Sequence, residues 1–316
     1  MLLNLKNRDQ WEDLNSEIKK ILNLTDEQTV RVYSGLQHAL YEFAVGTGLF
    51  LPHKRSIAYM MGVSPAFESL LPYFYKESYE VQPLLVSDFE RATDWVENLR
   101  KDTNFVMMCA DHAVTNEQYD SSKLEELLND KKMYSIVIHH HGLPDRVSLS
   151  RPYSIHIFSI TVDLAIAVAG PRFKSSPLIA QDQVWNLEIV KQKIVNARRM
   201  NEVRKQFVID FENQLPAGFK GLENLKNRLY DRSLIYTEKA SGEALRSRLI
   251  ENLKLNEADI ETTNMCRWNG FKMFDTWWDS KPSEDCLRGL LVISAEVVGV
   301  KVTAKALAEA LSQCQI

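Results

Sequence analysis

Residues 153–170 read YSIHIFSITVDLAIAVAG, an apolar stretch that follows a polar loop and ends at a glycine. Shorter apolar segments precede it, separated by segments with helical spacing. They are apolar almost throughout rather than alternating, which is typical of a parallel sheet covered by helices on both faces. The sequence therefore predicts an α/β domain with a mainly parallel sheet sandwiched by helices. The predicted strands span residues 29–33, 56–61, 79–85, 105–109 and 134–139, and the helices between them span residues 36–44, 65–75, 88–101 and 121–130.

The pattern changes near residue 186. A long, charged, amphipathic helix is predicted over residues 186–213, and it is suited to linking two lobes. Helices mixed with short apolar strands follow, and the chain closes on a helix over residues 303–313. The predicted organisation is a helical arm (1–25), a large α/β domain (26–185), a linking helix (186–219) and a small α+β domain (220–316).

The composition is that of an ordinary globular protein. The chain has 316 residues, with 38 Lys and Arg against 42 Asp and Glu, and a net charge of −4. This balance argues against electrostatic capture of nucleic acid or of an anionic membrane. No apolar run approaches the roughly 18 residues that span a bilayer, and the first residues do not resemble a signal peptide. The four cysteines are scattered, so we expect reduced thiols in a cytoplasmic protein.

Two early segments resemble landmarks of fold-type-I enzymes that depend on pyridoxal phosphate (PLP), the aspartate aminotransferase superfamily. Residues 32–39, VYSGLQHA, resemble the turn whose backbone N–H groups hold the cofactor phosphate at a helix N-terminus. The resemblance assigns Ser34, Gly35 and Leu36 to that role. Residues 64–67, SPAF, resemble the segment whose aromatic residue stacks on the pyridine ring, which implies Phe67. Alternatively, the two segments are helix starts, with Phe67 in the core.

Two later segments resemble the family but replace its polar ligands. Residues 110–120, ADHAVTNEQYD, resemble a loop whose Asn hydrogen-bonds the cofactor's phenolic oxygen, and His112 takes the place of that Asn. Asn116 takes the place of a glycine in the same loop. Residues 134–142, YSIVIHHHG, resemble the strand end whose Asp pairs with the protonated pyridine nitrogen, and His139 takes the Asp position. A neutral imidazole does not hold that proton as a carboxylate does.

Residues 153–170 resemble the family segment that carries the Schiff-base lysine and, eight residues later, an arginine. In this alignment Ser154 keeps a family serine, Ile155 stands at the lysine position and Asp163 stands at the arginine position. The resemblance therefore implies that the chain cannot attach PLP covalently.

The absence of the lysine does not depend on the alignment chosen. A shifted alignment that starts from Ser159 puts Val162 at the lysine position. The sequence has no lysine between Lys132 and Lys174, and Lys174 comes too late to replace it. Arg267 and Arg288 are candidates for binding a substrate carboxylate, although the sequence favours a surface arginine for each.

The histidine run over residues 139–141 suggests either a metal site or a ligand cleft. Strand alternation would place His139 and His141 on one face and His140 on the other. With His112, His156 and an Asp111 or Asp163 oxygen they could converge on a metal, but the run lacks recognised zinc spacing, and we assign no metal ligands.

Ligands of open α/β sheets bind at the carboxyl ends of the strands. We therefore expect His112, His139, His141 and Ser154 to gather at that edge of the sheet. If the cleft binds anything, these residues should line it.

The sequence thus favours an aminotransferase-like protein that has lost PLP catalysis and acts as a binding or structural homodimer. No catalytic residue is assigned. PLP or another small molecule would bind without a covalent bond. Two alternatives remain open: an active PLP-dependent aminotransferase whose motifs are aligned differently, and a metal- or histidine-dependent enzyme that uses residues 139–141.

Overall fold

The computed structural model forms two compact units. One comprises Met1–Asp111 with Tyr119–Arg198, and the other comprises His112–Gln118 with Arg199–Ile316. The long helix α7 (Leu187–Glu212) contributes residues to both units, and it confirms the helix predicted over residues 186–213. The structure describes residues 5–50, 53–61, 63–113, 117–141, 143, 151–161, 163–173, 186–221, 228–256, 260–262, 288–295 and 301–314.

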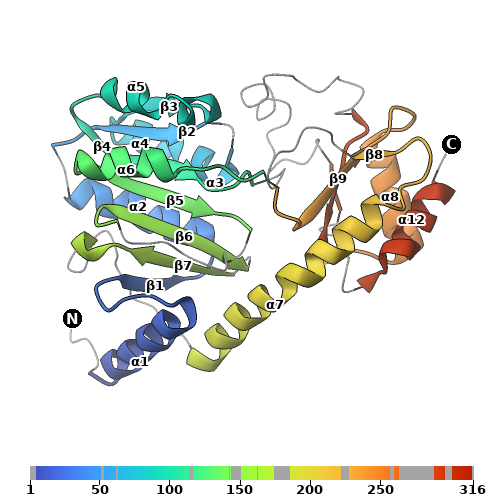
Figure 1. The fold of residues 1–316 in the computed structure, drawn as a ribbon, viewed down its shortest axis with the longest axis horizontal. Coiled ribbons are helices and arrows are strands. Elements are labelled where there is room, and N and C mark those ends of the chain that lie inside the picture. Colours follow the sequence, from blue (N-terminus) through green and yellow to red (C-terminus); the bar gives the residue numbers. More distant parts are fainter. Residues whose placement is uncertain are drawn as a thin grey trace. The chain divides into compact units, whose positions relative to one another are not determined.

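The first unit is built on a seven-stranded sheet in the order β1-β7-β6-β5-β4-β2-β3 (Figure 1). Strands β3, β2, β4, β5 and β6 are parallel to one another, whereas β7 is antiparallel to both β6 and β1. The predicted mainly parallel sheet is confirmed. The strands are β1 (Thr29–Tyr33), β2 (Ser56–Met60), β3 (Glu80–Leu84), β4 (Thr103–Cys109), β5 (Tyr134–His139), β6 (Ser154–Thr161) and β7 (Leu164–Ala169).

The apolar stretch 153–170 folds back on itself to form β6 and β7. Thr161 pairs with Leu164, so the two strands are joined by a short reversal of the chain. All of β7 is buried, because it is covered by neighbouring strands at its edges and by helices on its faces. An apolar stretch of this kind carries no alternation, so the sequence pattern did not reveal where the chain reverses.

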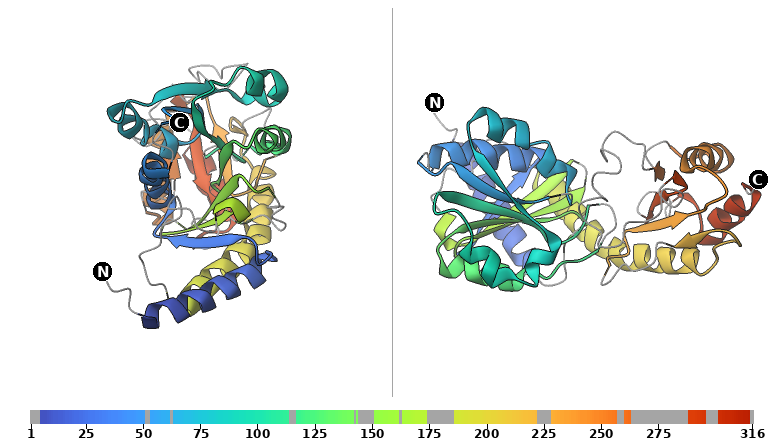
Figure 2. Two further views of the ribbon diagram at one scale, coloured as in Figure 1. Left: turned by 90° about the vertical axis from the view of Figure 1, so that its left-hand side faces the viewer. Right: turned by 90° about the horizontal axis from the view of Figure 1, so that it is seen from above.

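Helices cover both faces of this sheet, as Figure 2 shows. Helix α2 (Leu36–Phe50) packs on β6 and β7, and α6 (Ser122–Asp130) packs on β5. A buried cluster joins α1 (Leu5–Leu22) and the first half of α7 to β1, β6 and β7. It includes Ile18, Phe158 and Ile194, each fully buried. The remaining helical elements of the unit are α3 (Pro65–Glu68), α4 (Leu71–Lys76), η1 (Val86–Phe89), α5 (Ala92–Glu97) and η2 (Pro171–Phe173).

The second unit has its own antiparallel sheet, in the order β10-β11-β9-β8. Its core contains Phe211 from the second half of α7, Leu249 from α8 and Leu311 from α12. The predicted mixture of helices and short strands is confirmed, including the final helix. The elements are β8 (Lys220–Gly221), β9 (Arg232–Tyr236), α8 (Gly242–Leu253), β10 (Ile260–Thr262), β11 (Leu291–Ser294) and α12 (Ala304–Gln313).

Within the described residues, no helix combines the length and the apolar character needed to cross a membrane. Two of the four cysteines, Cys109 and Cys314, lie in the described part of the chain, where both are free and buried. Burial raises the pKa of both thiols, which disfavours the thiolate that a nucleophile or a metal ligand needs.

Candidate functional site

The candidate site is the edge of the first unit's sheet at which its parallel strands end. Since β7 is antiparallel to both β1 and β6, β1 runs in the same direction as β6 and ends at this edge too. Polar residues follow the strand ends, at a place where open α/β sheets bind their ligands. They are Ser34 after β1, Ser64 after β2, Asp111 after β4, His139–His141 at the end of β5 and Thr161 with Asp163 at the end of β6.

The turn after β1 has the form of an anion site. Gly35 has φ of +94°, a conformation that side chains resist, and α2 starts directly after it at Leu36. The N–H groups of the first helical turn have no acceptor within the helix and point outward from its N-terminal end, where an anion can bind. Ser34 is exposed, with its Oγ 2.8 Å from Nδ1 of His38. The three predicted phosphate-binding residues therefore lie together at the expected edge.

Phe67 does not offer a stacking surface. It lies in the short helix α3 and is fully buried, with 0% of its surface exposed. This agrees with the alternative reading of Phe67 as a core residue, because a ring enclosed by protein has no face left for a ligand.

His112 follows Asp111 directly, but it groups with the second unit. It is buried, and its backbone N–H donates to the carbonyl of Glu117 at 2.8 Å. Glu117 in turn forms an isolated antiparallel bridge with Arg228.

The ring of His139 is stacked inside the layer that α6 covers. Its centroid is 4.3 Å from that of Phe158, with an angle of 24° between the planes. Its Nε2 is 3.1 Å from Nδ1 of His156, the neighbour on β6. Burial, together with the proximity of His156, lowers the pKa of His139 to about 3. His139 is therefore neutral at physiological pH.

His156 is held in turn by a carboxylate. Its Nε2 lies 3.2 Å from Oε2 of Glu125 on α6, and the other oxygen of Glu125 accepts a hydrogen bond from Ser121 at 2.7 Å. Burial raises the pKa of Glu125, but the hydrogen bond and charge of His156 outweigh burial and leave the pKa below its ordinary value. The sequence analysis missed Glu125. The available signal was an acidic residue between Leu124 and Leu128 on the buried face of α6.

The other two histidines of the run share a second carboxylate. The Asp111 carboxylate accepts the backbone N–H groups of His140 and His141 at 2.8 and 3.0 Å. Both side chains are close to it as well, at 3.4 and 3.9 Å. Although burial raises the pKa of Asp111, these histidines hold it well below its ordinary value. Asp111 is therefore ionised at physiological pH.

The expected alternation along residues 139–141 is wrong, because β5 ends at His139. His140 and His141 lie beyond the strand and both turn to Asp111, whereas His139 faces His156. Among the described residues, no group of three or more His, Cys, Asp or Glu side chains is arranged to hold a metal ion.

The contacts of His140 define the direction of its hydrogen bonds. Its Nδ1 faces the Asp111 carbonyl at 3.0 Å and the Asp111 carboxylate at 3.4 Å, so Nδ1 carries a proton. Its Nε2 is 2.8 Å from the hydroxyl of Ser64. In the neutral ring Nε2 accepts the Ser64 proton.

Ser154 does not lie with these residues, and the expectation that it would is wrong. Ser154 is the first residue of β6, and its Oγ accepts a hydrogen bond from Oγ of Ser135 near the start of β5 at 2.9 Å. Ile155, which pairs with Ile136 and Ala169, is buried at the same end of the strand. Both residues are therefore at the edge opposite to the candidate site, because a parallel strand starts at one edge and ends at the other.

The turn between β6 and β7 reaches the candidate edge instead. It runs through Thr161, Val162 and Asp163, so the shifted alignment, with Val162 at the lysine position, fits the strand direction better than Ile155 does. Val162 itself lies outside the described residues. Asp163 accepts hydrogen bonds from Thr161 and from Nζ of Lys193 on α7, each at 2.6 Å, and they lower its pKa. Lys193 is thus the amine that touches this turn.

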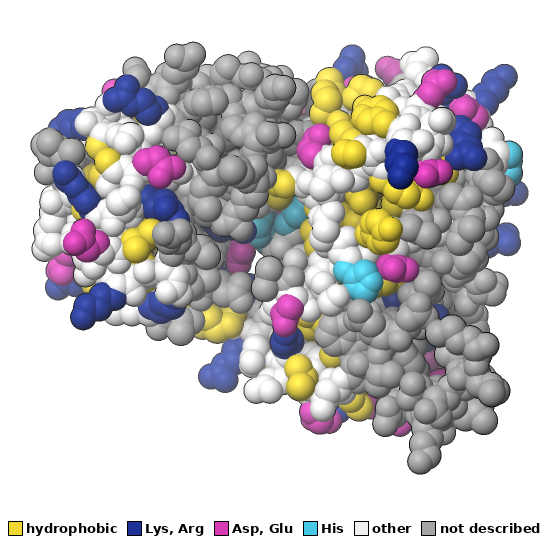
Figure 3. Space-filling view, turned by 180° about the vertical axis from the view of Figure 1, so that it is seen from behind, with side chains coloured by type: hydrophobic (Ala, Val, Ile, Leu, Met, Phe, Trp, Pro, Cys, Tyr) yellow, Lys and Arg dark blue, Asp and Glu magenta, His cyan; other side chains and the backbone are white. Residues whose placement is uncertain are grey.

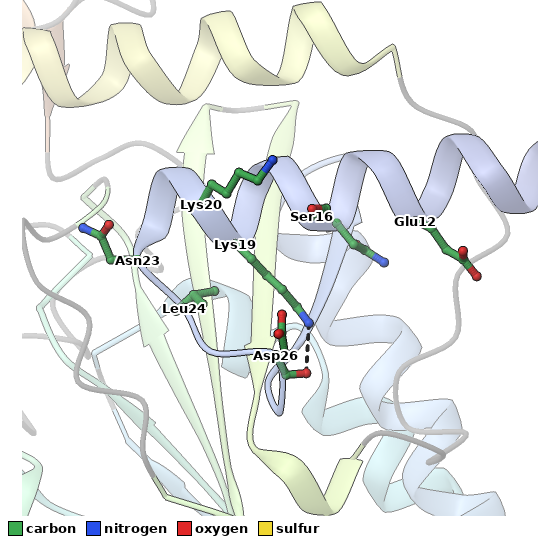
Figure 4. A pocket seen from close by; sticks show the side chains of 8 residues that line it. Glu12, Ser16, Lys19, Lys20, Asn23, Leu24 and Asp26 are labelled. Carbon is green, nitrogen blue, oxygen red and sulfur yellow. Dashed lines mark hydrogen bonds between the residues drawn. The ribbon is translucent and has the colours of Figure 1, made fainter.

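The other predicted residues contribute less. Arg288 is exposed, as expected for a surface arginine. Asn116, Lys174 and Arg267 lie outside the described residues. A surface hollow along α1 is lined by residues that include Lys19 and Asp26, and Nζ of Lys19 donates to the Asp26 carbonyl at 3.1 Å (Figure 4). This hollow lies next to the loop that enters the amino end of β1, away from the strand ends of the candidate site.

Neither protein-family models nor curated protein sequences match the chain. Solved structures do. The cysteine desulfurase CsdA of Escherichia coli has a TM-score of 0.68 and 11% identity, over 98% of this chain and 84% of that one. A ureidoglycine–glyoxylate aminotransferase of Bacillus subtilis has a TM-score of 0.65 and 10% identity, over 97% and 89%. An O-acetylhomoserine (thiol)-lyase structure from Campylobacter jejuni, which contains pyridoxyl-lysine monophosphate, has a TM-score of 0.68 and 11% identity, over 95% and 85%.

At these identities the likeness establishes the fold alone. The chain has the fold of the fold-type-I PLP enzymes, as the resemblance predicted, and it spans most of the length of these structures.

The buried, neutral state of His139 predicts a pH-dependent stability. The unfolded chain takes up a proton at the ordinary pKa of 6.5, but the folded chain does so only at about 3. The contribution of His139 to the free energy of unfolding is therefore fully present above pH 6.5. It falls by up to about 1.4 kcal/mol per pH unit as pH decreases from there towards 3. His139→Phe keeps the ring and should remove this slope in urea unfolding at a series of pH values. The exposed His53→Phe is the control and should keep it. Equal slopes in wild type and His139→Phe would contradict the prediction.

Proposed function

We propose that the chain binds PLP, or a phosphorylated small molecule of similar shape, without a covalent bond, and that it has lost aminotransferase catalysis. The observation that carries the proposal is the turn at the carboxyl end of β6. The sequence there reads Thr161-Val162-Asp163, and its acidic residue is paired with Lys193. The Nζ of Lys193 donates to that carboxylate, and an amine held in this way is not free to attack an aldehyde.

The phosphate end of the site fits the group. The first turn of α2 provides N–H groups without an acceptor in the helix and the positive end of a helix dipole, and Ser34 adds an exposed hydroxyl. These groups bind a phosphate without any lysine. They therefore support PLP binding in a protein that forms no covalent bond with it.

The ring end of the site is chemically altered. When bound, PLP supplies an electron sink whose strength depends on a protonated ring nitrogen. A neutral His139 provides a weaker partner for that proton than a carboxylate does, because it adds no charge. This supports a binding role over a catalytic one.

We also propose that the chain forms a homodimer, as its resemblance to the family implies. Two large aromatic residues of the first unit are unusually exposed, Tyr41 at 53% and Tyr75 at 60%. Tyr73 lies beside Tyr41, with ring centroids 6.4 Å apart. Hydrophobic side chains form groups on the part of the surface at the right of Figure 3. Exposed aromatic groups of this kind favour a subunit contact.

The proposal predicts that borohydride traps no specific PLP adduct. Purified protein is incubated with stoichiometric PLP, reduced, and analysed by intact mass and peptide mapping. No stoichiometric mass increase is expected, because Lys193, the amine that contacts the turn in the described part of the chain, donates its hydrogen bond to Asp163. An adduct that maps to Lys193 and disappears in Lys193→Arg would contradict the proposal and favour an active enzyme. The matched control is Lys191→Arg, on the same helix but paired with Glu17.

The proposed phosphate site predicts a selective effect of charge at the start of α2. Leu36→Glu places a carboxylate beside the N–H groups, and should weaken PLP binding at least about tenfold while leaving the weak binding of pyridoxal, which has no phosphate, unchanged. Leu36→Gln is the control of equal size, with binding measured by calorimetry. Equal loss of PLP and pyridoxal in Leu36→Glu would show that the phosphate binds elsewhere.

A second candidate function, a histidine-dependent enzyme, is favoured by the alignment of Ser64, His140 and Asp111. The direction of the hydrogen bonds is that of a serine nucleophile, with His140 as the base and Asp111 as its partner. Ser64 is fully buried, however, so a substrate cannot reach its hydroxyl in this conformation. We therefore rank this function second.

Burial of Ser64 predicts that a small sulfonyl fluoride will not label it. The measurement is intact mass after incubation with phenylmethylsulfonyl fluoride, with Ser69→Ala, at an exposed position on the next turn, as the control. Stoichiometric labelling that is lost in Ser64→Ala and kept in Ser69→Ala would overturn the ranking.

A further inference from the structure

A chain of hydrogen bonds runs from α6 across two strands to the end of β5. It links Ser121, Glu125, His156 and His139 through distances of 2.7, 3.2 and 3.1 Å. Ser121, Glu125 and His156 are all buried. We propose that the Glu125–His156 pair controls which nitrogen of His139 carries its proton. At the end of β5, Nδ1 of His139 is then a hydrogen-bond acceptor for a ligand in one state of the pair and a donor in the other.

The first step of the argument is the direction of the bond to Glu125. An ionised carboxylate only accepts hydrogen bonds, so Nε2 of His156 carries a proton. His156 therefore has one remaining nitrogen, Nδ1, with which to meet Nε2 of His139.

The second step follows from the protonation state of His156. When His156 is neutral, its Nδ1 accepts, so Nε2 of His139 donates and Nδ1 of His139 is left as an acceptor. When His156 is protonated, its Nδ1 donates, so Nε2 of His139 accepts. Because burial keeps His139 neutral, its single proton is then on Nδ1, which becomes a donor. One proton enters at Nδ1 of His139, and the proton on Nε2 moves to Nδ1 of His156, so the count balances.

Charged groups around His156 and His139 have opposing effects on the protonation of the two rings. The charge of Glu125 favours protonated His156, whereas Arg151, whose Nη1 is 3.8 Å from the same carboxylate, opposes it. Near His139, Asp111 favours positive charge and His140 disfavours it. Phe158 covers the His139 ring and does not titrate.

The ligand that distinguishes the two states is an aromatic ring with a nitrogen. The acceptor state of His139 matches a protonated ring nitrogen, and the donor state matches an unprotonated one. This part rests on the proposed function, whereas the control of the His139 proton does not.

The test is nitrogen-15 NMR of the histidine side chains, which distinguishes a protonated from an unprotonated ring nitrogen. Spectra of the full chain are recorded from about pH 9 to about pH 5, the range in which histidines titrate. We expect the His139 proton to move from Nε2 to Nδ1 as His156 becomes protonated. In Glu125→Gln the negative charge that favours protonated His156 is lost, so the pH-dependent move should disappear and the proton should stay on one nitrogen throughout. Glu126→Gln, at an exposed neighbouring position, is the matched control and should behave as wild type.

Two results would overturn the inference: a His139 proton on the same nitrogen at every pH in the wild type, or an unchanged switch in folded Glu125→Gln. Circular dichroism verifies that each variant is folded. A PLP titration of the same samples separates this inference from the proposed function. If the His139 proton moves but the protein does not bind PLP, the proposed ligand is refuted and the control of the proton stands. If the protein binds PLP but the His139 proton does not move, the control of the proton is refuted and the proposed ligand stands.

Discussion

The antiparallel pairing of β7 with β6 and β1 is the constraint on which the rest of the site depends. Five registered pairs, from Thr29 with Ala169 to Tyr33 with Ala165, fix β1 along β7, and β6 is fixed along the other edge of β7. The reversal from β6 to β7 is confined to a short turn, and it lies at the edge where β1, β4 and β5 end. The turn therefore lies where ligands of such sheets bind, but it contains few residues that could contact a ligand. Its polar contacts are already taken by Thr161, Asp163 and Lys193.

Around that turn, two buried carboxylates organise the histidines. Asp111 binds His140 and His141 through their backbone and side chains, and Glu125 binds His156, which reaches His139. Each carboxylate is buried, and each is stabilised as an anion by histidine partners, because an unpaired buried charge would be costly. The same arrangement explains why a run of three histidines makes no metal site in the described part of the chain: its members face different partners.

Much of the fold could be predicted from the sequence, because buried parallel strands and amphipathic helices leave periodic patterns. Ser34, Gly35 and Leu36 form the predicted turn into a helix, since a Ser-Gly before a helix depends on local backbone geometry; their role in binding phosphate stays a prediction. Ser154 was placed at the wrong edge. Along a strand that is apolar throughout, no alternation fixes the register of a short motif, so a shift of several residues goes unnoticed. Glu125 was missed for a different reason. Its partner His156 is 31 positions away, and such a pairing is visible only after the sheet and α6 have assembled.

The central claim is our proposal that this fold binds the phosphate of PLP at the first turn of α2 without a covalent bond to the aldehyde; in the described part of the chain, the amine that contacts the β6–β7 turn, Lys193, is paired with Asp163. A crystal structure of the protein grown with PLP tests this most directly. The account predicts density for the phosphate at the first turn of α2, beside Ser34 and Leu36, with a free aldehyde and no continuous density to any lysine. Continuous density from the ring to Lys193, or to any other lysine, would contradict it.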